Sequence, residues 1–314
     1  MPNTLYIECL SGISGDMTIG AFLDLGVDQK LFLQELSKIN IDGYKIEIRK
    51  DQKNGITGTK FDVILDCDGA HEHSHDHDHT HGHSHDHDHA HEHSHGHTRD
   101  HDHTHDHDHT HNHEHTHDHD HTHNHEHGHS HDHSHGDHHH EHRNLEAINA
   151  IIEKAELSER VKKLSKEMFL HVAKAEAKIH DKPLNEVHFH EVGAVDSIVD
   201  IIGAAICIDL LDIDEIIATP IHTGTGFVKC AHGKIPVPAP ATLEILKGMP
   251  VYSTGIRSEL VTPTGAAIAK TLVQKFDDRP EMSIERVGYG LGTKDLEISN
   301  LLRMSIGKKK QVRY

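Results

Sequence analysis

Leu5-Tyr-Ile-Glu-Cys9 is a short apolar run typical of a β-strand, and it leads into the glycine-rich turn Ser11-Gly-Ile-Ser-Gly-Asp16. Apolar residues from Met17 to Leu25 then recur at helical spacing. A strand, a glycine-rich turn and a helix start, in this order, offer free backbone N–H groups to an anion. The turn lacks the Gly-Lys-Ser/Thr ending of a P-loop, and Ser14 or Asp16 is equally suited to cap the helix. Anion binding and simple capping both remain open for this loop.

Strands and helices alternate irregularly in the rest of the chain. The pattern predicts a helix over 28–39 and strands over 43–50 and 56–66, with Gly55 and Gly58 marking the connection between the strands. No strict strand–helix–strand repeat follows. We therefore expect a fold between α/β and α+β, with a mixed sheet and packed helices, interrupted by a long disordered His-rich insertion. The expected parts are an N-terminal α/β lobe (1–69), the His-rich tract (70–142), a main α/β domain that completes the fold (143–307) and a basic C-terminal stub (308–314).

The His-rich tract holds most of the chain's histidines and most of its charge. Of the 42 histidines among 314 residues, 36 lie between His71 and His142, most of them at every second position. The tract also has 17 acidic residues and one basic residue, so it carries −16 of the total net charge of −20. Neither face of a strand built from it would be apolar, and nothing would offset an ordering entropy of about 1–2 kcal/mol per residue. We expect it to be disordered without metal.

Metal binding is the function that this composition favours. Imidazole is the commonest ligand of borderline divalent ions, and nickel and copper bind nitrogen ligands more strongly than iron or manganese do. At four to six imidazoles per ion, the tract would hold roughly six to nine ions at saturation. The alternatives are a neutral repeat expansion and a pH-dependent solubility segment.

Several classes of protein are disfavoured by the remaining sequence. There is no apolar run of 18 residues, so no membrane span or membrane partner is expected, and no secretory signal is visible at the N-terminus. Outside the tract the chain is slightly acidic, which argues against a nucleic-acid partner. The four cysteines form no C-x-x-C pair and fit a reducing compartment, so we expect a cytoplasmic protein.

The densest group of polar residues within apolar sequence is Val187-His-Phe-His-Glu-Val-Gly-Ala-Val-Asp-Ser-Ile-Val-Asp200. His188 and His190 fall on one side of an extended segment, and a helix is expected to begin near Ala194. Asp196 and Asp200 are one turn apart on that mostly apolar helix, so they share a face and need partners. Two histidines with a carboxylate form a plausible divalent-metal site. A hydrogen-bonded polar cluster without metal is the alternative.

Three further glycine-rich segments follow at expected strand or helix ends. They are Ile221-His-Thr-Gly-Thr-Gly226, Glu259-Leu-Val-Thr-Pro-Thr-Gly265 and Val287-Gly-Tyr-Gly-Leu-Gly-Thr-Lys-Asp295. Each is weak alone, but together with the first turn they suggest a phosphate-bearing ligand held by backbone amides. Between them, the prolines at 236, 238 and 240 exclude a central strand and predict an extended surface segment.

Five of these segments, in this order, resemble one protein family. They are Ser11-Gly-Ile-Ser-Gly-Asp-Met17, His188-Phe-His-Glu-Val-Gly-Ala-Val-Asp-Ser-Ile-Val-Asp-Ile-Ile-Gly203, Gly233-Lys-Ile-Pro-Val-Pro-Ala-Pro-Ala-Thr242, Leu260-Val-Thr-Pro-Thr-Gly-Ala267 and Gly288-Tyr-Gly-Leu-Gly-Thr-Lys-Asp295. They resemble the LarC nickel-insertion family of nickel-pincer cofactor biosynthesis. A central His-rich stretch is common in that family.

The resemblance implies a reaction. Ni(II) would be inserted into pyridinium-3,5-bisthiocarboxylic acid mononucleotide, with one carbon–nickel and two sulfur–nickel bonds formed and CTP consumed. Such an enzyme is a CTP-dependent cyclometallase, of the lyase or chelatase type. Because the carbon–nickel bond replaces a ring C–H bond, a carboxylate or imidazole base is expected to take the proton.

We assign roles to individual residues from this clustering and this resemblance. The residues expected to take part in catalysis are His190, Glu191 and Asp16. Those expected to bind the mononucleotide are Ser11, Gly12, Ser14, Gly15, Thr262, Thr264 and Gly265. The expected nickel ligands are His188, His190, Glu191 and Asp196, with tract histidines such as His71, His73, His101, His103, His138, His139 and His140.

The resemblance also implies partners. Family members continue beyond the expected strand over 302–306 into a C-terminal domain that binds CTP with Mg²⁺ or Mn²⁺. This chain resembles the first of two parts, so we expect it to need the C-terminal CTP-binding part. The expected recipient of the product is an apo enzyme of the lactate racemase type.

Two other functions fit parts of the sequence. A nickel or zinc storage metallochaperone would use the tract and perform no chemistry, and its glycine-rich segments would be structural. A GTPase-type metallochaperone is also His-rich, but the missing P-loop ending argues against it. Binding of the thiolated pyridinium mononucleotide to the globular part would distinguish insertion from storage.

Overall fold

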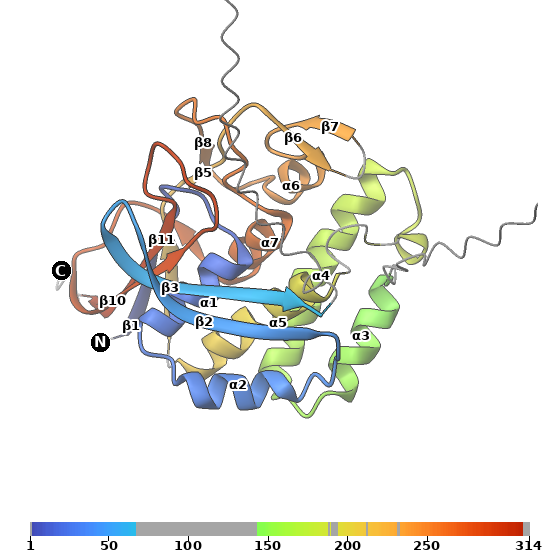
Figure 1. Cartoon of the computed structure of the whole chain (residues 1–314), viewed down its shortest axis with the longest axis horizontal. Helices are drawn as coiled ribbons and strands as arrows, with labels where there is room; N and C mark the ends of the chain where they lie inside the picture. Colours follow the sequence, from blue (N-terminus) through green and yellow to red (C-terminus); the bar gives the residue numbers. More distant parts are fainter. Residues whose placement is uncertain are drawn as a thin grey trace, which may run out of the picture. The chain divides into compact units, whose positions relative to one another are not determined.

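A computed structural model describes residues 2–66, 143–187, 189, 194–211, 213–230 and 233–309 (Figure 1). Seven of the described strands form one sheet in the order β2-β3-β10-β11-β1-β4-β9. In it, β1 pairs antiparallel with β11 on one side and parallel with β4 on the other, so the sheet is mixed, as expected. The strand bounds are β1 Asn3–Glu8, β2 Tyr44–Lys53, β3 Ile56–Leu65, β4 Glu215–Ala218, β9 Lys275–Phe276, β10 Met282–Leu291 and β11 Leu301–Lys309.

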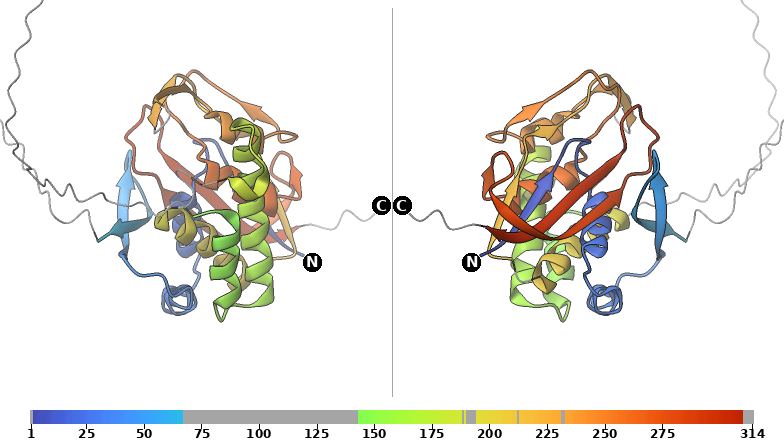
Figure 2. Two further views of the ribbon diagram at one scale, coloured as in Figure 1. Left: turned by 90° about the vertical axis from the view of Figure 1, so that its right-hand side faces the viewer. Right: turned by 90° about the vertical axis from the view of Figure 1, so that its left-hand side faces the viewer.

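Helices cover one side of the central strands (Figure 2). Helix α5 (Val195–Leu210) is buried along nearly its whole length from Ser197 to Ile208, as its apolar sequence requires. It packs between α1 (Gly15–Asp24), which lies on β10 and β3, and α4 (Glu159–Ile179). The other helices are α2 Gln29–Ser37, α3 Leu145–Lys154, α6 Pro240–Ile245 and α7 Pro263–Leu272.

The predicted turn over 287–295 is wrong in its first half, because β10 continues to Leu291. Gly288 and Gly290 lie within that strand, directly beneath α1. A Cβ at Gly290 would fall 1.8 Å from the carbonyl oxygen of Met17, and one at Gly288 would fall 2.4 Å from that of Ala21. The alternating glycines therefore allow a helix to lie against a strand. Gly58 lies inside β3 (Ile56–Leu65), in agreement with the strand predicted over 56–66.

The proline-containing segment stays outside the main sheet, as predicted. It contributes to a separate two-stranded sheet of β6 (Phe227–Cys230) and β7 (Gly233–Pro236). A second small sheet pairs β5 (Ile221–His222) with β8 (Val251–Tyr252). Within the described ranges, no helix has the length and apolar character needed to cross a membrane.

Candidate functional site

The N-terminal ends of three helices, α1, α5 and α7, meet at one cavity of about 340 Å³, which β3 borders. Free N–H groups and the helix dipole make such ends favourable for negative groups. Here they meet several carboxylates, so the cavity combines hydrogen-bond donors with acidic side chains. Its lining residues are Ser14, Gly15, Asp16, Phe61, Asp62, Val63, Asp196, Ser197, Asp200, Glu259, Thr262, Pro263 and Thr264.

Two loops from distant parts of the sequence form one wall through backbone hydrogen bonds. The N–H of Ile13 donates to the carbonyl of Leu260 at 2.9 Å, and that of Thr262 donates to the carbonyl of Ile13 at 3.2 Å. Two glycines make this approach possible: a Cβ at Gly12 would fall 1.8 Å from the Leu260 oxygen, and one at Gly265 would fall 2.1 Å from the Ile13 oxygen. These glycines were predicted to bind the ligand, and the geometry gives them a packing role.

Hydroxyl groups line the same wall. Thr262 caps α7 by accepting a hydrogen bond from the N–H of Gly265 at 3.1 Å, and it shares a second bond of 2.8 Å with the hydroxyl of Thr264. Ser14, at the N-cap position of α1, makes no side-chain cap; its hydroxyl donates instead to Asp16 at 2.5 Å. The hydroxyl of Ser11 lies behind this wall and donates to the carbonyl of Ser299 at 2.7 Å.

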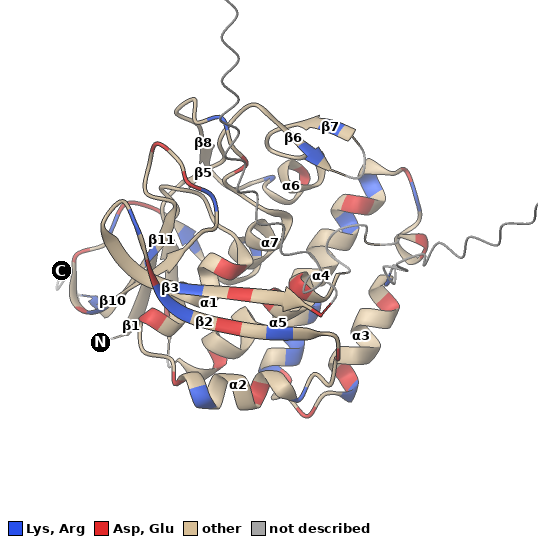
Figure 3. Cartoon of the chain, in the orientation of Figure 1, with Lys and Arg blue, Asp and Glu red and all other residues tan. Residues whose placement is uncertain are grey.

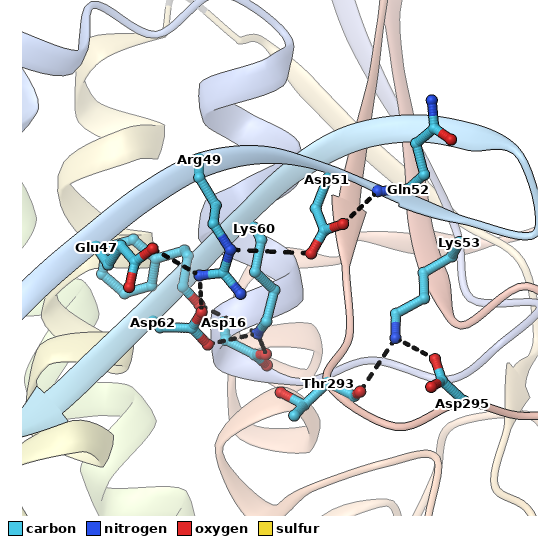
Figure 4. Close-up of polar contacts among 11 residues, drawn as sticks. Asp16, Glu47, Arg49, Asp51, Gln52, Lys53, Lys60, Asp62, Thr293 and Asp295 are labelled. Carbon is cyan, nitrogen blue, oxygen red and sulfur yellow. Dashed lines mark hydrogen bonds and ion pairs between the residues drawn. The ribbon is translucent and has the colours of Figure 1, made fainter. Parts of the chain in front are cut away.

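A buried lysine links α1 to β3 (Figure 4). The side chain of Lys60 is only 4% exposed, and its Nζ lies 2.7 Å from Asp16 Oδ2 and 2.9 Å from Asp62 Oδ1. Arg49 on β2 holds the other oxygen of Asp62 at 2.5 Å. Burial alone would lower the pKa of Lys60, but the two carboxylates outweigh it and raise that pKa. In Figure 3, both β2 and β3 carry basic and acidic positions along their length.

Asp196 and Asp200 also line the cavity. Unlike Asp16 and Asp62, neither forms an ion pair at 4.0 Å or less with a described residue. Burial raises the pKa of Asp200 well above its ordinary value; the charges of Asp16 and Asp196 raise it further, while Lys60 and the Asp16 N–H oppose them. The site is crowded, since a Cβ at Gly15 would fall 2.3 Å from Asp200 Oδ2. Asp196 is exposed at the cavity, but partial loss of solvent still raises the pKa of its carboxyl. Hydrogen bonds from the backbone N–H groups of Ser197 and of Asp196 itself lower that pKa by less.

Comparison with known proteins adds to this geometry. The model of the family described as "Nickel insertion protein" matches residues 5–314. The chain belongs to this family.

Three relatives of the chain carry one name, pyridinium-3,5-bisthiocarboxylic acid mononucleotide nickel insertion protein. The relative from Clostridium kluyveri is 44% identical over 308 residues, covering 98% of this chain and 62% of the relative. That from Clostridium acetobutylicum is 46% identical over 326 residues (97% and 64%), and that from Geobacillus kaustophilus is 41% identical over 311 residues (98% and 60%). The chain thus spans 60–64% of the length of these relatives. No solved structure matches the chain.

The structure brings part of the predicted site of this family member together. Ser14, Gly15, Asp16, Asp196, Thr262 and Thr264, which come from three separate sequence segments, all line the one cavity. Sequence reasoning missed Lys60 and Asp62, and it noted Asp200 only for its spacing from Asp196. The available signal was the alternation of charged and apolar residues in Thr59-Lys-Phe-Asp-Val63, which places both charges on one face of a strand.

The predicted nickel ligands His188, His190 and Glu191 lie outside the described residues, as do the tract histidines. Phe189, between two of these ligands, is described: its N–H donates to the carbonyl of Arg143 at 3.2 Å, and its ring packs against Phe169. Within the described part of the chain, no group of three or more His, Cys, Asp or Glu side chains is arranged to hold a metal ion. The nickel site therefore stays a prediction.

Proposed function

We propose that this chain inserts nickel into pyridinium-3,5-bisthiocarboxylic acid mononucleotide, and that the cavity between α1, α5 and α7 binds the mononucleotide. The observation that carries the proposal is the meeting of three helix N-termini, two threonine hydroxyls and two carboxylates at one cavity, where neither carboxylate forms an ion pair with a described residue. The names of the relatives supply the identity of the substrate.

The chemistry of this substrate fits the two sides of the cavity. A pyridinium mononucleotide carries a positive ring at one end and a negative phosphate at the other. In our proposal the N-terminus of α7, with Thr262 and Thr264, receives the phosphate through N–H and O–H donors. Asp196 and Asp200, on α5, face the cationic ring. The ligand thereby spans the two walls with its charges matched.

Nickel is the second substrate. Insertion breaks a ring C–H bond and forms a carbon–nickel bond, so the electron pair of the C–H bond passes to nickel and the proton must pass to a base. We propose Asp200 as the base among the described residues, because it lines the cavity without forming an ion pair with any of them and its raised pKa favours accepting a proton. We propose Asp196, with His188, His190 and Glu191 from the preceding segment, as nickel ligands, and His190 and Glu191 as alternative bases.

CTP dependence and the recipient belong to the same proposal. The described residues that line the cavity include no lysine or arginine, which makes it a poor site for a triphosphate. We therefore propose that CTP, with Mg²⁺ or Mn²⁺, binds to the C-terminal part of the system. The product would pass to an apo enzyme of the lactate racemase type.

Isothermal titration of the nickel-free mononucleotide into the full chain tests this proposal. We expect saturable one-to-one binding that persists when residues 71–142 are deleted and that weakens in Thr264→Val, which keeps the shape but removes a hydroxyl. Lys247→Met, on the exposed surface near α6, serves as the control. Absence of binding by both proteins would refute insertion at this cavity and favour the alternative, a nickel or zinc storage chaperone without chemistry.

A further inference from the structure

Lys60 is the most buried ion-paired lysine of the described residues, and it lies just beneath the cavity wall. Its Nζ contacts Asp16 and Asp62, and it also donates to the carbonyl of Phe61 at 3.3 Å. Removing an ammonium group from water is costly, and the cost is recovered only where partners with good geometry surround it. All three hydrogen-bonding directions of this amine therefore have protein partners, and none is left for a ligand.

The consequence for Asp16 is that both of its carboxylate oxygens are engaged. Oδ2 accepts from Lys60 and Oδ1 accepts from Ser14, so the side chain is held from opposite sides. Asp62 is held in the same way between Lys60 and Arg49. Both aspartates line the cavity, yet in this arrangement their charges are already matched by Lys60 and Arg49.

We propose that Lys60 is a positioning residue of the cavity: it holds Asp16 and Asp62, and so leaves Asp196 and Asp200 as the carboxylates that meet the cationic part of the ligand. The inference rests on the proposed function, since it assumes that the pyridinium mononucleotide binds here. It assigns Asp16 a fixed structural charge at the start of α1 instead of a role as the base.

The electrostatic surroundings give this inference a measurable signature. The charged groups that face Lys60 are Asp16 on α1, Asp62 on β3 with Arg49 behind it on β2, and Asp200 on α5, which in turn feels the charge of Asp196. Without the ammonium group, Asp62 and Asp200 lose a nearby positive charge that favours their ionised forms, so the pKa of each rises and a proton is retained more readily. A cationic ligand would have to expel that proton on binding.

The test is calorimetric titration of the nickel-free mononucleotide into the full chain, in buffers of different ionisation enthalpy, which counts the protons released. For Lys60→Met we expect about one proton more than in the wild type. We also expect an affinity about tenfold lower at pH 7 that recovers as the pH is raised by about one unit. Lys60→Arg should keep wild-type behaviour. Lys53→Met is the matched control: Lys53 lies on the same hairpin but pairs with Asp295, away from the cavity (Figure 4).

Each outcome decides between the two claims. If the wild type binds the mononucleotide but Lys60→Met shows the same proton count and affinity, Lys60 has no positioning role and the proposed function stands. If the wild type does not bind, both fall. Should Lys60→Met fail to fold, the charge-matched double variant Lys60→Met with Asp62→Asn replaces it. Positioning predicts for this variant a wild-type proton count but, in an insertion assay with the C-terminal CTP-binding part added, a lower kcat at unchanged KM; an unchanged kcat overturns the inference.

Discussion

At the scale of one residue, the surroundings that suit Asp200 to the role proposed for it also reduce the stability of the folded protein. Its carboxylate lies against Gly15 and near Asp16 and Asp196, and these surroundings raise its pKa well above the ordinary value. The folded protein therefore binds more protons than the unfolded chain between the unfolded and the folded pKa of this group. Stability is lost as the pH rises through that window.

Asp200→Asn removes this loss, and we expect it to stabilise the protein at pH 7.5. In a domain of this size, each kcal/mol recovered raises Tm by about 2–4 °C. The gain should shrink toward pH 4, near the ordinary pKa of an aspartate, because the wild-type residue is then protonated when folded at little cost. Calorimetric unfolding at the two pH values measures it, with Asp209→Asn on the same helix as the control, since Asp209 is engaged by Ser158.

The same variant should lose insertion activity by about a hundredfold or more, which is the usual contribution of a general base. A variant that is neither stabilised at neutral pH nor impaired in insertion would show that Asp200 is ionised at no cost and takes no part in the reaction.

At the scale of elements, the sequence predicts well what depends on local pattern. The apolar spacing after Ala194 predicts the start of α5 correctly, because helical periodicity is a local property. The alternating glycines 288 and 290 led to a wrong prediction of a turn, because the same pattern is found in a turn and in a strand against which a helix packs closely. The pairing of Lys60 with Asp16 could not be predicted from the sequence either, because no local pattern indicates which helix packs on which strand.

The start of α7 packs closely against the loop over 10–14, and Gly265 makes this contact possible. Gly265→Ala would place a methyl group 2.1 Å from the carbonyl oxygen of Ile13, a backbone atom that cannot turn away. We expect a loss of about 1–3 kcal/mol in the free energy of unfolding, as for other overpacked sites, together with weaker mononucleotide binding. Urea denaturation and calorimetric titration measure the two effects. Thr271→Ala lies near the other end of α7, and the Thr271 hydroxyl has no hydrogen-bond partner among the described residues, so this variant should change neither quantity. Wild-type behaviour of Gly265→Ala would contradict this account.

At the scale of the whole molecule, two kinds of sequence share one chain. The tract carries a net charge of −16, whereas the other 242 residues carry −4 and hold the apolar core. The elements before and after the tract belong to one sheet, in which β1 lies between β11 and β4. In our proposal, metal storage and substrate binding are therefore properties of different segments, and we expect that each can be changed without the other.

Deleting residues 71–142 should therefore leave the thermal unfolding of the metal-free protein nearly unchanged. Bound nickel should fall from roughly six to nine ions per chain to about one or two. Scanning calorimetry and elemental analysis of dialysed protein measure these quantities, with a variant that replaces the tract histidines by serine as the length-matched control. A large loss of stability without metal would sink the idea that the tract is a dispensable metal store.

The final prediction concerns CTP, whose triphosphate carries about four negative charges and needs cationic or amide donors together with a divalent ion. The cavity presents Asp16, Asp62, Asp196 and Asp200, and the cations Lys60 and Arg49, which lie near it among the described residues, are already engaged by aspartates. We expect the purified chain to bind the mononucleotide but to consume no CTP, as followed by chromatography of the nucleotides. Adding the polypeptide that corresponds to the remaining part of the Clostridium kluyveri relative, fused or in trans, should give nickel insertion. Consumption of CTP and formation of the nickel cofactor by the chain alone would place the nucleotide site within these residues and overturn the assignment of this acidic cavity to the pyridinium substrate alone.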